Sequence, residues 1–344
     1  MKRIKYIDIL RAIAIICVVI GHIPYPNLNP EIHKWLYAFH IPLFFFVSGI
    51  SLHFTNYHHS KLKTIFKKRF KRIYLPYLIW GIILALPNIS LSTFIIILYG
   101  THQSITSVSN SSLWFLPVLF CATILLDLIL YRSHKQKTTK RLPLLLIVLL
   151  CISILTPTQT NIQNLLDGHN LPLGIDIVPM ASFFMLSGFI FKDSRKNKKI
   201  KCPLIFIISL TTLCLFAITY FSLKNDVDYV LMAENHYGNY LYFFIAAFSG
   251  IIASILVTNI ITNYTKTISR LLQLIGSNTM TIFILHKYPL KLINDLVLLA
   301  TIPNISSFII IPLYSIVTLI VCIPASSLIK KYIPFLIGES QCFH

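Results

Sequence analysis

Long apolar segments alternate with short polar ones along most of the chain. Ten of the apolar segments are close to the length that crosses a bilayer as a helix, and they occupy residues 6–23, 36–55, 75–98, 113–131, 142–156, 172–191, 203–223, 239–261, 270–288 and 305–329. The segment 142–156 is short, and 75–98 contains Pro76 and Pro87. The pattern predicts an all-α integral membrane protein with about ten transmembrane helices.

The apolar stretch 288–304 is not counted among these helices. Its sequence favours an amphipathic piece that lies in the outer membrane interface. An eleventh span here would move Lys330 and Lys331 to the outer side, although lysine and arginine normally gather on the cytoplasmic side. We therefore expect an interfacial segment.

The composition agrees with a membrane protein. Charged residues make up 12% of the chain, about half of their share in soluble domains. The formal net charge is +19, but the cations sit in clusters between apolar segments, which argues against a nucleic-acid partner. Of the 30 lysines and arginines, 25 fall on one predicted side, four on the other and Arg11 within a span. This asymmetry predicts that both termini are cytoplasmic.

The cysteines and the N-terminal segment further limit the class of protein that this chain can form. Seven cysteines are scattered without a C-x-x-C pair, so we predict neither a disulfide framework nor a metal site. The first apolar segment is long enough to span and lacks a small-x-small cleavage site, so we expect it to stay in the protein. Residues 1–344 are expected to form a single polytopic membrane domain with no appended soluble domain.

The first predicted helix carries Arg11 and His22. Their separation of eleven residues places them on nearly the same face, about 16 Å apart along the helix axis. An ionisable residue inside a bilayer is a functional hypothesis by default. Arg11 has three open interpretations: snorkelling to the inner headgroups, an ion pair with Asp8 three residues earlier, or a bidentate contact with an oxyanion ligand.

His22 and His40 lie at the predicted outer ends of the first two helices. A neutral imidazole can take a proton from a hydroxyl, because its ordinary pKa lies near the working pH. Two plainer interpretations stay open: His22 caps a helix end, and His40 bonds to backbone near Pro42, which lacks an N–H.

The segment Lys61–Arg72 holds seven cations in twelve residues. Such a segment keeps its neighbouring helices oriented and attracts anionic lipid. Within it Arg69 and Arg72 are three residues apart and would be adjacent on one helical face. Two positioned guanidinium groups also suit a ligand with phosphates.

Four sequence elements together resemble the membrane-bound acyltransferase-3 family. They are YIDILRAIAIICVVIGH (6–22), FHIPLFFFVSG (39–49), RFKR (69–72) and SLWFLP (112–117). The second is especially similar to that of the fucose 4-O-acetylase-like sugar O-acetyltransferases. The resemblance spans roughly residues 6–329 and is densest over 6–76.

The resemblance implies an O-acetyltransferase of the bacterial inner membrane. It would move an acetyl group from cytoplasmic acetyl-CoA to a hydroxyl of a cell-surface glycan or its glycolipid precursor. By the same resemblance His22, Arg11 and His40 are catalytic, and Arg69, Arg72 and Arg11 bind the donor. We expect no tightly bound cofactor, and the sequence leaves the oligomeric state open.

Several other residues are expected to support the site. Asp8 would orient Arg11. Asp176 would hold a histidine in its productive tautomer, or else is a solvated turn acid. Trp114 belongs to the resemblance and is equally well explained as an aromatic-belt residue. His286 resembles a histidine of the family's late helices, and we assign it no role.

Two segments of the chain are similar in sequence, LFFFVSGI (43–50) and SFFMLSGF (182–189). We call this pair the internal echo. Ser48 and Gly49, with their counterparts Ser187 and Gly188, favour close helix packing. Two alternatives stay open. The small residues leave room for the pantetheine arm of the donor, or the two segments come from a duplicated half of the protein.

The remaining acids are expected to be structural or solvated. Asp127 would pair with cations at the inner surface. Asp226, Asp228 and Glu234 lie in an outer loop that is solvated or touches the acceptor. The rival function is a transporter or flippase for an anionic glycolipid, with Arg11 as a counter-charge. It is disfavoured because the later helices repeat neither Arg11 nor His22.

Overall fold

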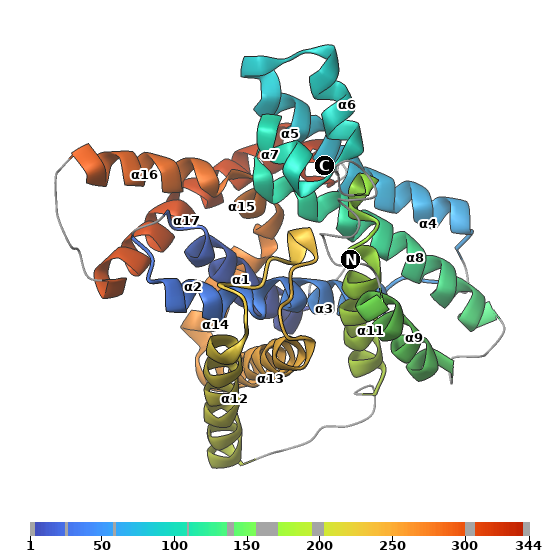
Figure 1. Ribbon diagram of the computed structural model, residues 1–344, viewed down its shortest axis with the longest axis vertical. Coiled ribbons are helices and arrows are strands. Elements are labelled where there is room, and N and C mark those ends of the chain that lie inside the picture. The colour runs from blue at the N-terminus through green and yellow to red at the C-terminus, as the bar shows by residue number, and fades with distance from the viewer. Residues whose placement is uncertain are drawn as a thin grey trace. The chain divides into compact units, whose positions relative to one another are not determined.

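The computed structural model describes residues 4–24, 27–57, 60–108, 110–135, 141–155, 171–194, 203–299 and 307–339. Over these ranges the chain is helical and forms no strand (Figure 1). Apart from its helices, it makes an isolated antiparallel bridge between Leu231 and His236. The all-α prediction is therefore confirmed for the part of the chain that the structure describes.

The helices follow the apolar segments. In chain order they are α1 (Lys5–Gly21), α2 (Pro30–Tyr37), α3 (His40–Leu52), α4 (Leu62–Arg69), α5 (Leu75–Ala85), α6 (Leu91–Tyr99), α7 (His102–Val108), α8 (Phe115–Lys135), α9 (Leu142–Leu155), α11 (Val178–Ser194), α12 (Leu204–Lys224), α13 (Tyr240–Tyr264), α14 (Lys266–Ser277), α15 (Thr279–Leu285), α16 (Lys287–Leu299) and α17 (Ser307–Tyr332). A π-helix, η1 (Phe70–Tyr74), and the 3-10 turns η3 (Ser111–Trp114), η5 (Pro172–Gly174), η6 (Met232–Glu234) and η7 (Pro334–Ile337) join or flank them.

Six of the described helical segments are long and apolar enough to cross a membrane. They are Pro30–Leu52, Ser111–Ser133, Pro172–Lys192, Leu204–Lys224, Tyr240–Tyr264 and Ile309–Tyr332. The chain is thus a multi-pass membrane protein, and the described helices fall short of the predicted count of about ten.

The missing spans have physical causes. Pro87 lies in the 3-10 turn between α5 and α6, because its ring cannot continue a helix, so 75–98 becomes two helices of 11 and 9 residues. Helices α14 and α15 are together long and apolar enough to cross a membrane, but the chain bends by 62° between Ser277 and Thr279. Helix α1 has 17 residues and α9 has 14, so both are shorter than the roughly 20 residues of a typical transmembrane helix.

The described chain divides into two compact units, each made of separate segments. Unit 1 takes its described residues from Met1–Val47, Lys199–Val230 and Tyr237–Leu328. Its central helix α1 packs on α14, α13, α2 and α15, and α12 packs along α13. The polar helix end at His22 is therefore held in place by several neighbouring helices.

A glycine brings α1 and α14 close together in unit 1. A Cβ added at Gly276 would overlap the backbone carbonyl of Asp8, so the two helices touch backbone to backbone. Ile9, Leu10 and Ile15 of α1 are fully buried. Helix α1 is consequently a core element of unit 1.

Unit 2 takes its described residues from Ser48–Lys198, Leu231–His236 and Ile329–His344. Helix α11 packs on α8 and α9, and α4 and η1 pack on α8 (Figure 1). A Cβ at Gly49 would overlap the carbonyl of Met185, so the two halves of the internal echo meet here. Close helix packing, one of the interpretations of the Ser-Gly pair, is confirmed at Gly49.

Candidate active site

The ion pair between Arg11 and Asp8 is present in unit 1. Arg11 Nη1 lies 3.5 Å from Asp8 Oδ1, with the arginine side chain 38% exposed and the aspartate side chain 9% exposed. The carboxylate, one turn earlier on the same face, holds the guanidinium in one direction. The predicted ion pair is therefore confirmed, whereas the role of Asp8 in orienting Arg11 and the contact of Arg11 with a ligand stay predictions.

His22 forms the C-terminal cap of α1. Its Nδ1 lies 2.8 Å from the carbonyl oxygen of Val18. A carbonyl oxygen only accepts hydrogen bonds, so Nδ1 carries the proton and Nε2 keeps its lone pair. The ring is half-buried. The helix end thus holds His22 in the tautomer that a general base needs.

Two further histidines share this tautomer. His40 Nδ1 lies 2.7 Å from the carbonyl of Leu36, and His286 Nδ1 lies 2.8 Å from that of Phe283. Both rings are buried, and His286 Nε2 has no hydrogen-bond partner among the described residues. The backbone bond predicted as one reading of His40 is confirmed. The pattern behind all three is a carbonyl three or four residues earlier in a helix.

Aromatic contacts assemble these histidines into one cluster. The rings of His22 and His286 meet edge to face with centroids 4.9 Å apart. The Tyr37 ring lies 6.2 Å from that of His22 and 4.7 Å from that of His40. His33, which the sequence analysis left aside, lies 4.1 Å from Tyr37. We call these five residues the histidine cluster.

A cavity of about 640 Å³ opens beside the histidine cluster. Its lining comes from the link after α1, from α2 and from the segment after α12. The lining residues are Ile23, Leu28, Pro30, Glu31, His33, Lys34, Leu223, Asp228 and Tyr229. The volume lies within the range of about 300–1,000 Å³ that is usual for small-molecule sites. Unit 1 therefore combines a cluster of histidines with a space for a ligand.

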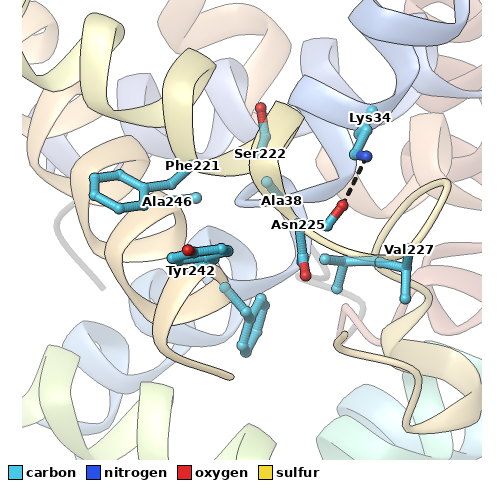
Figure 2. Close-up of a pocket in the computed structure, with 10 residues that line it drawn as sticks. Lys34, Ala38, Phe221, Ser222, Asn225, Val227, Tyr242 and Ala246 are labelled. Atoms are coloured by element: carbon cyan, nitrogen blue, oxygen red, sulfur yellow. Dashed lines mark hydrogen bonds between the residues drawn. The ribbon is translucent and has the colours of Figure 1, made fainter. Parts of the chain in front are cut away.

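A second pocket nearby is a place of close packing between segments rather than a ligand site. Figure 2 shows Lys34 donating from Nζ to the carbonyl of Asn225, and the two atoms are 2.9 Å apart, while Phe221 and Tyr242 lie at the left of the view, away from this bond. The space has no room for a water molecule. The pocket matters because it fixes the ammonium group of Lys34 and the segment after α12.

In unit 2, Arg69 is engaged by the protein itself. Its Nε and Nη2 donate to the two carboxylate oxygens of Asp127, at 2.7 and 3.1 Å. Nη2 also donates to Thr55 Oγ1 at 2.7 Å, and Tyr57 donates its hydroxyl to Asp127 at 2.6 Å. Three of the five guanidinium N–H groups are used. The predicted pairing of Asp127 with a cation is confirmed, and its position at the inner surface stays a prediction.

The protonation of this group follows from burial and charge. Burial and the negative charge of Asp127 raise the pKa of Tyr57 above its ordinary value. Burial alone would lower the pKa of Arg69, but the hydrogen bonds and charge of Asp127 outweigh it and the net shift is upward. Arg69 therefore keeps its positive charge beside Asp127.

Arg72 is placed differently from Arg69. It lies in the π-helix η1, whose wider turn rotates successive residues by about 80° rather than about 100°. The two arginines are consequently not on one face: the side chain of Arg69 is 14% exposed, whereas Arg72 is exposed. No described residue forms an ion pair with Arg72.

The C-terminal turn η7 supports the π-helix. Trp80 donates from Nε1 to the carbonyl of Leu336 at 2.7 Å. Gly338 has a φ of +70°, and a Cβ there would overlap the carbonyl of Arg72. The backbone of Arg72 is therefore tightly held while its side chain points to solvent.

A family model described as an acyltransferase domain, Acyl_transf_3, matches residues 4–327. The chain belongs to the acyltransferase-3 family. No curated protein and no solved structure matches it. The match gives the rival transporter prediction no support, and it does not reach the finer fucose 4-O-acetylase-like branch.

Trp114 and Asp176 of this acyltransferase lie in another polar cluster, within unit 2. Both line a small depression, and Asp176 Oδ2 accepts from the side-chain nitrogen of Asn235 at 2.5 Å. Asp176 is buried, so the solvated turn acid is wrong, and its described contact is with an asparagine rather than a histidine. Trp114 is buried too.

The same cluster holds a histidine that the sequence analysis missed. His102 Nδ1 lies 3.0 Å from Glu234 Oε1, and its ring meets that of Trp114 edge to face. Glu234 was expected to be solvated, and it is instead half-buried and paired. The pairing joins residues 132 positions apart, so no local pattern could have revealed it.

Proposed function

We propose that this acyltransferase moves an acetyl group from cytoplasmic acetyl-CoA to a hydroxyl of a cell-surface glycan or its precursor. The observation that carries the proposal is the tautomer of His22. Its Nδ1 is committed to the carbonyl of Val18, which leaves Nε2 free to accept a proton. The adjoining cavity provides room for a hydroxyl-bearing acceptor.

The proposed chemistry needs a base and then an acid at one atom. His22 Nε2 takes the proton of the acceptor hydroxyl while its oxygen attacks the thioester carbonyl. The carbon–sulfur bond breaks and the thiolate of coenzyme A leaves. His22 Nε2 then returns the proton to that sulfur, so that an ester and free coenzyme A result. The ring is ready for the next cycle.

His286 and His40 extend this proposal. The imidazolium of His22 needs an acceptor for its second N–H, and the His286 ring lies against it with an unpartnered Nε2. His40 contacts Tyr37, which in turn contacts His22. We assign His286 to stabilising the charged form of His22 and His40 to positioning Tyr37.

The donor is assigned to the cationic segment of unit 2. Arg72 is exposed without an ion pair to a described residue, so it can bind phosphate oxygens bidentately. Arg69 retains Nη1 beyond its bonds to Asp127 and Thr55. These two arginines form the proposed donor site in unit 2, on the cytoplasmic side that the charge distribution predicts, and Arg11 of unit 1 stays a separate predicted contact of the donor.

The proposal is tested by the acetylation of surface glycans in cells that make each variant at equal expression. His22→Gln keeps the size and polarity of the side chain but removes the base, so we expect the acetyl mark to disappear. His236→Gln, an exposed histidine outside the histidine cluster, is the matched control and should keep the mark. Full acetylation with His22→Gln would overturn the proposal.

A further inference from the structure

The cavity beside the histidine cluster is bounded by three separate segments of unit 1. Ile23, the residue after His22, forms one part of the wall, and residues of α2 and of the segment after α12 form the rest. His33 and Tyr229 lie on this wall with their rings edge to face, 4.6 Å apart. Both also contact Tyr37, at 4.1 and 5.2 Å. Tyr37 thus contacts both of these wall residues and the ring of His22.

The charges that line the cavity have the opposite sign to the protein as a whole. The chain carries 30 cationic and only 11 acidic residues, yet Glu31 and Asp228 both line this space. Neither carboxylate forms an ion pair with a described residue. Lys34 is the one lysine of the lining, and its ammonium group donates a hydrogen bond to the carbonyl of Asn225. The formal charge of the lining is thus −1 when His33 is neutral.

This lining suits one chemical class of sugar. Carboxylate oxygens accept hydrogen bonds from hydroxyl and ammonium groups, and the ring of Tyr229 offers a face for the carbon side of a sugar. A carboxylate or phosphate on the ligand would instead meet two fixed negative charges. Specificity often rests on such repulsion as much as on attraction.

We propose that this cavity binds the sugar unit of the acceptor and selects sugars without negative charge, with amino sugars bound best. The inference rests on the proposed function, because it makes the ligand of the cavity the acceptor of the acetyl group. It names Glu31 and Asp228 as the residues that determine the charge preference.

The test measures sugar binding to the full-length protein in lipid nanodiscs, without acyl-CoA. Methyl glycosides of glucosamine, glucose and glucuronic acid share one ring geometry and differ in charge, and saturation-transfer NMR can rank their affinities. We expect the order glucosamine, glucose, glucuronic acid. Equal or tighter binding of the glucuronide would overturn the proposal.

Substitutions assign the preference to the two carboxylates. Glu31→Gln combined with Asp228→Asn keeps the side-chain shapes and should reduce the glucosamine-to-glucuronide ratio by about fivefold for each charge removed. Asp226→Asn is the matched control, because Asp226 lies in the same segment but does not line the cavity. An unchanged ratio in the double variant, or an equal loss in the control, would contradict the assignment.

Ionic strength gives a second measure on the unmodified protein. Charge selection should weaken as added salt screens the carboxylates, whereas selection by shape should not. Because acetyl transfer is not measured, these results do not depend on the outcome for His22→Gln. A preference that persists unchanged in high salt would reject the charge mechanism even if the double variant failed to fold.

Discussion

At the scale of single residues, the function of each histidine depends on which ring nitrogen the backbone occupies. His22, His40 and His286 all direct Nδ1 at a carbonyl of the preceding helical turn. A carbonyl oxygen has two lone pairs, and those of Val18 and Leu36 already accept one backbone N–H each, so the histidine donates to the second lone pair and leaves Nε2 free. Backbone geometry alone therefore prepares the base.

His286 is expected to take part in the transfer. Its Nε2 is buried without a described partner beside the ring of His22, so it can accept a proton or hydrogen bond when His22 is charged. We expect His286→Phe, which keeps a ring but removes the nitrogen, to lower acetyl transfer by about 100-fold or more. The measurement is the rate of coenzyme A release from acetyl-CoA in the presence of acceptor.

A readout besides the rate separates chemistry from folding. The pH profile of the activity should change in His286→Phe, because His22 loses the imidazole that contacts its ring. Thermal unfolding of the variant should stay close to that of the wild type. A lower rate with an unchanged pH profile would give His286 a packing role only.

At the scale of elements, the change from α4 to η1 separates two arginines that look alike in the sequence. A regular helix would have kept Arg69 and Arg72 near one face. The π-helix turns Arg69 toward Asp127 and leaves Arg72 in solvent. One arginine thereby stabilises the packing of α4 on α8, and the other is available to a ligand.

Alanine substitutions should separate these two roles. Arg69→Ala leaves Asp127 charged and buried, so we expect a loss of about 3–5 kcal/mol in stability, seen as early thermal unfolding. Arg72→Ala should change stability by no more than about 0.5 kcal/mol but weaken acetyl-CoA binding in the purified protein. Undiminished acetyl-CoA binding with Arg72→Ala would remove this residue from the donor site.

At the scale of the whole molecule, the distribution of charge makes a prediction about orientation. The helices that span, and the cations between them, leave Lys67 of α4 on the predicted cytoplasmic side and Asp226 on the outer side. Both side chains are exposed, so the side of the membrane on which each residue lies can be tested directly.

Cysteine labelling checks this orientation in intact cells. In a background whose native cysteines are replaced by alanine, Asp226→Cys should react with a maleimide that cannot cross the membrane. Lys67→Cys should react only after the cells are opened. The reverse pattern would place Arg72 outside, and the donor site would then face away from the compartment that supplies acetyl-CoA.

Much of the fold could be predicted because apolar length is a local property. The predicted apolar segments contain helices, although α4 and α7 lie outside them, and the ion pair of Asp8 with Arg11 follows from a spacing of three residues. The breaks between helices were harder to predict. Pro87 was visible in the sequence, but whether a proline kinks a helix or ends it depends on what packs around it.

Less of the candidate site could be predicted. His22, His40 and Arg11 stood out because polar groups in apolar segments are costly. His33 and Tyr229 lie nearly 200 positions apart in the chain and meet at the cavity through folding alone. The same holds for His102 with Glu234, and for Asp127 with Arg69.

The sequence by itself determined the membrane class, the positions of the helices, the polar pair Arg11 and His22 and the acyltransferase-3 resemblance. These features rest on hydrophobicity, periodicity and order along the chain, which are all local. The tertiary structure decided which arginine is occupied, which nitrogen of each histidine is free and where the cavity lies. Those features depend on contacts between distant segments, and a linear pattern does not specify them.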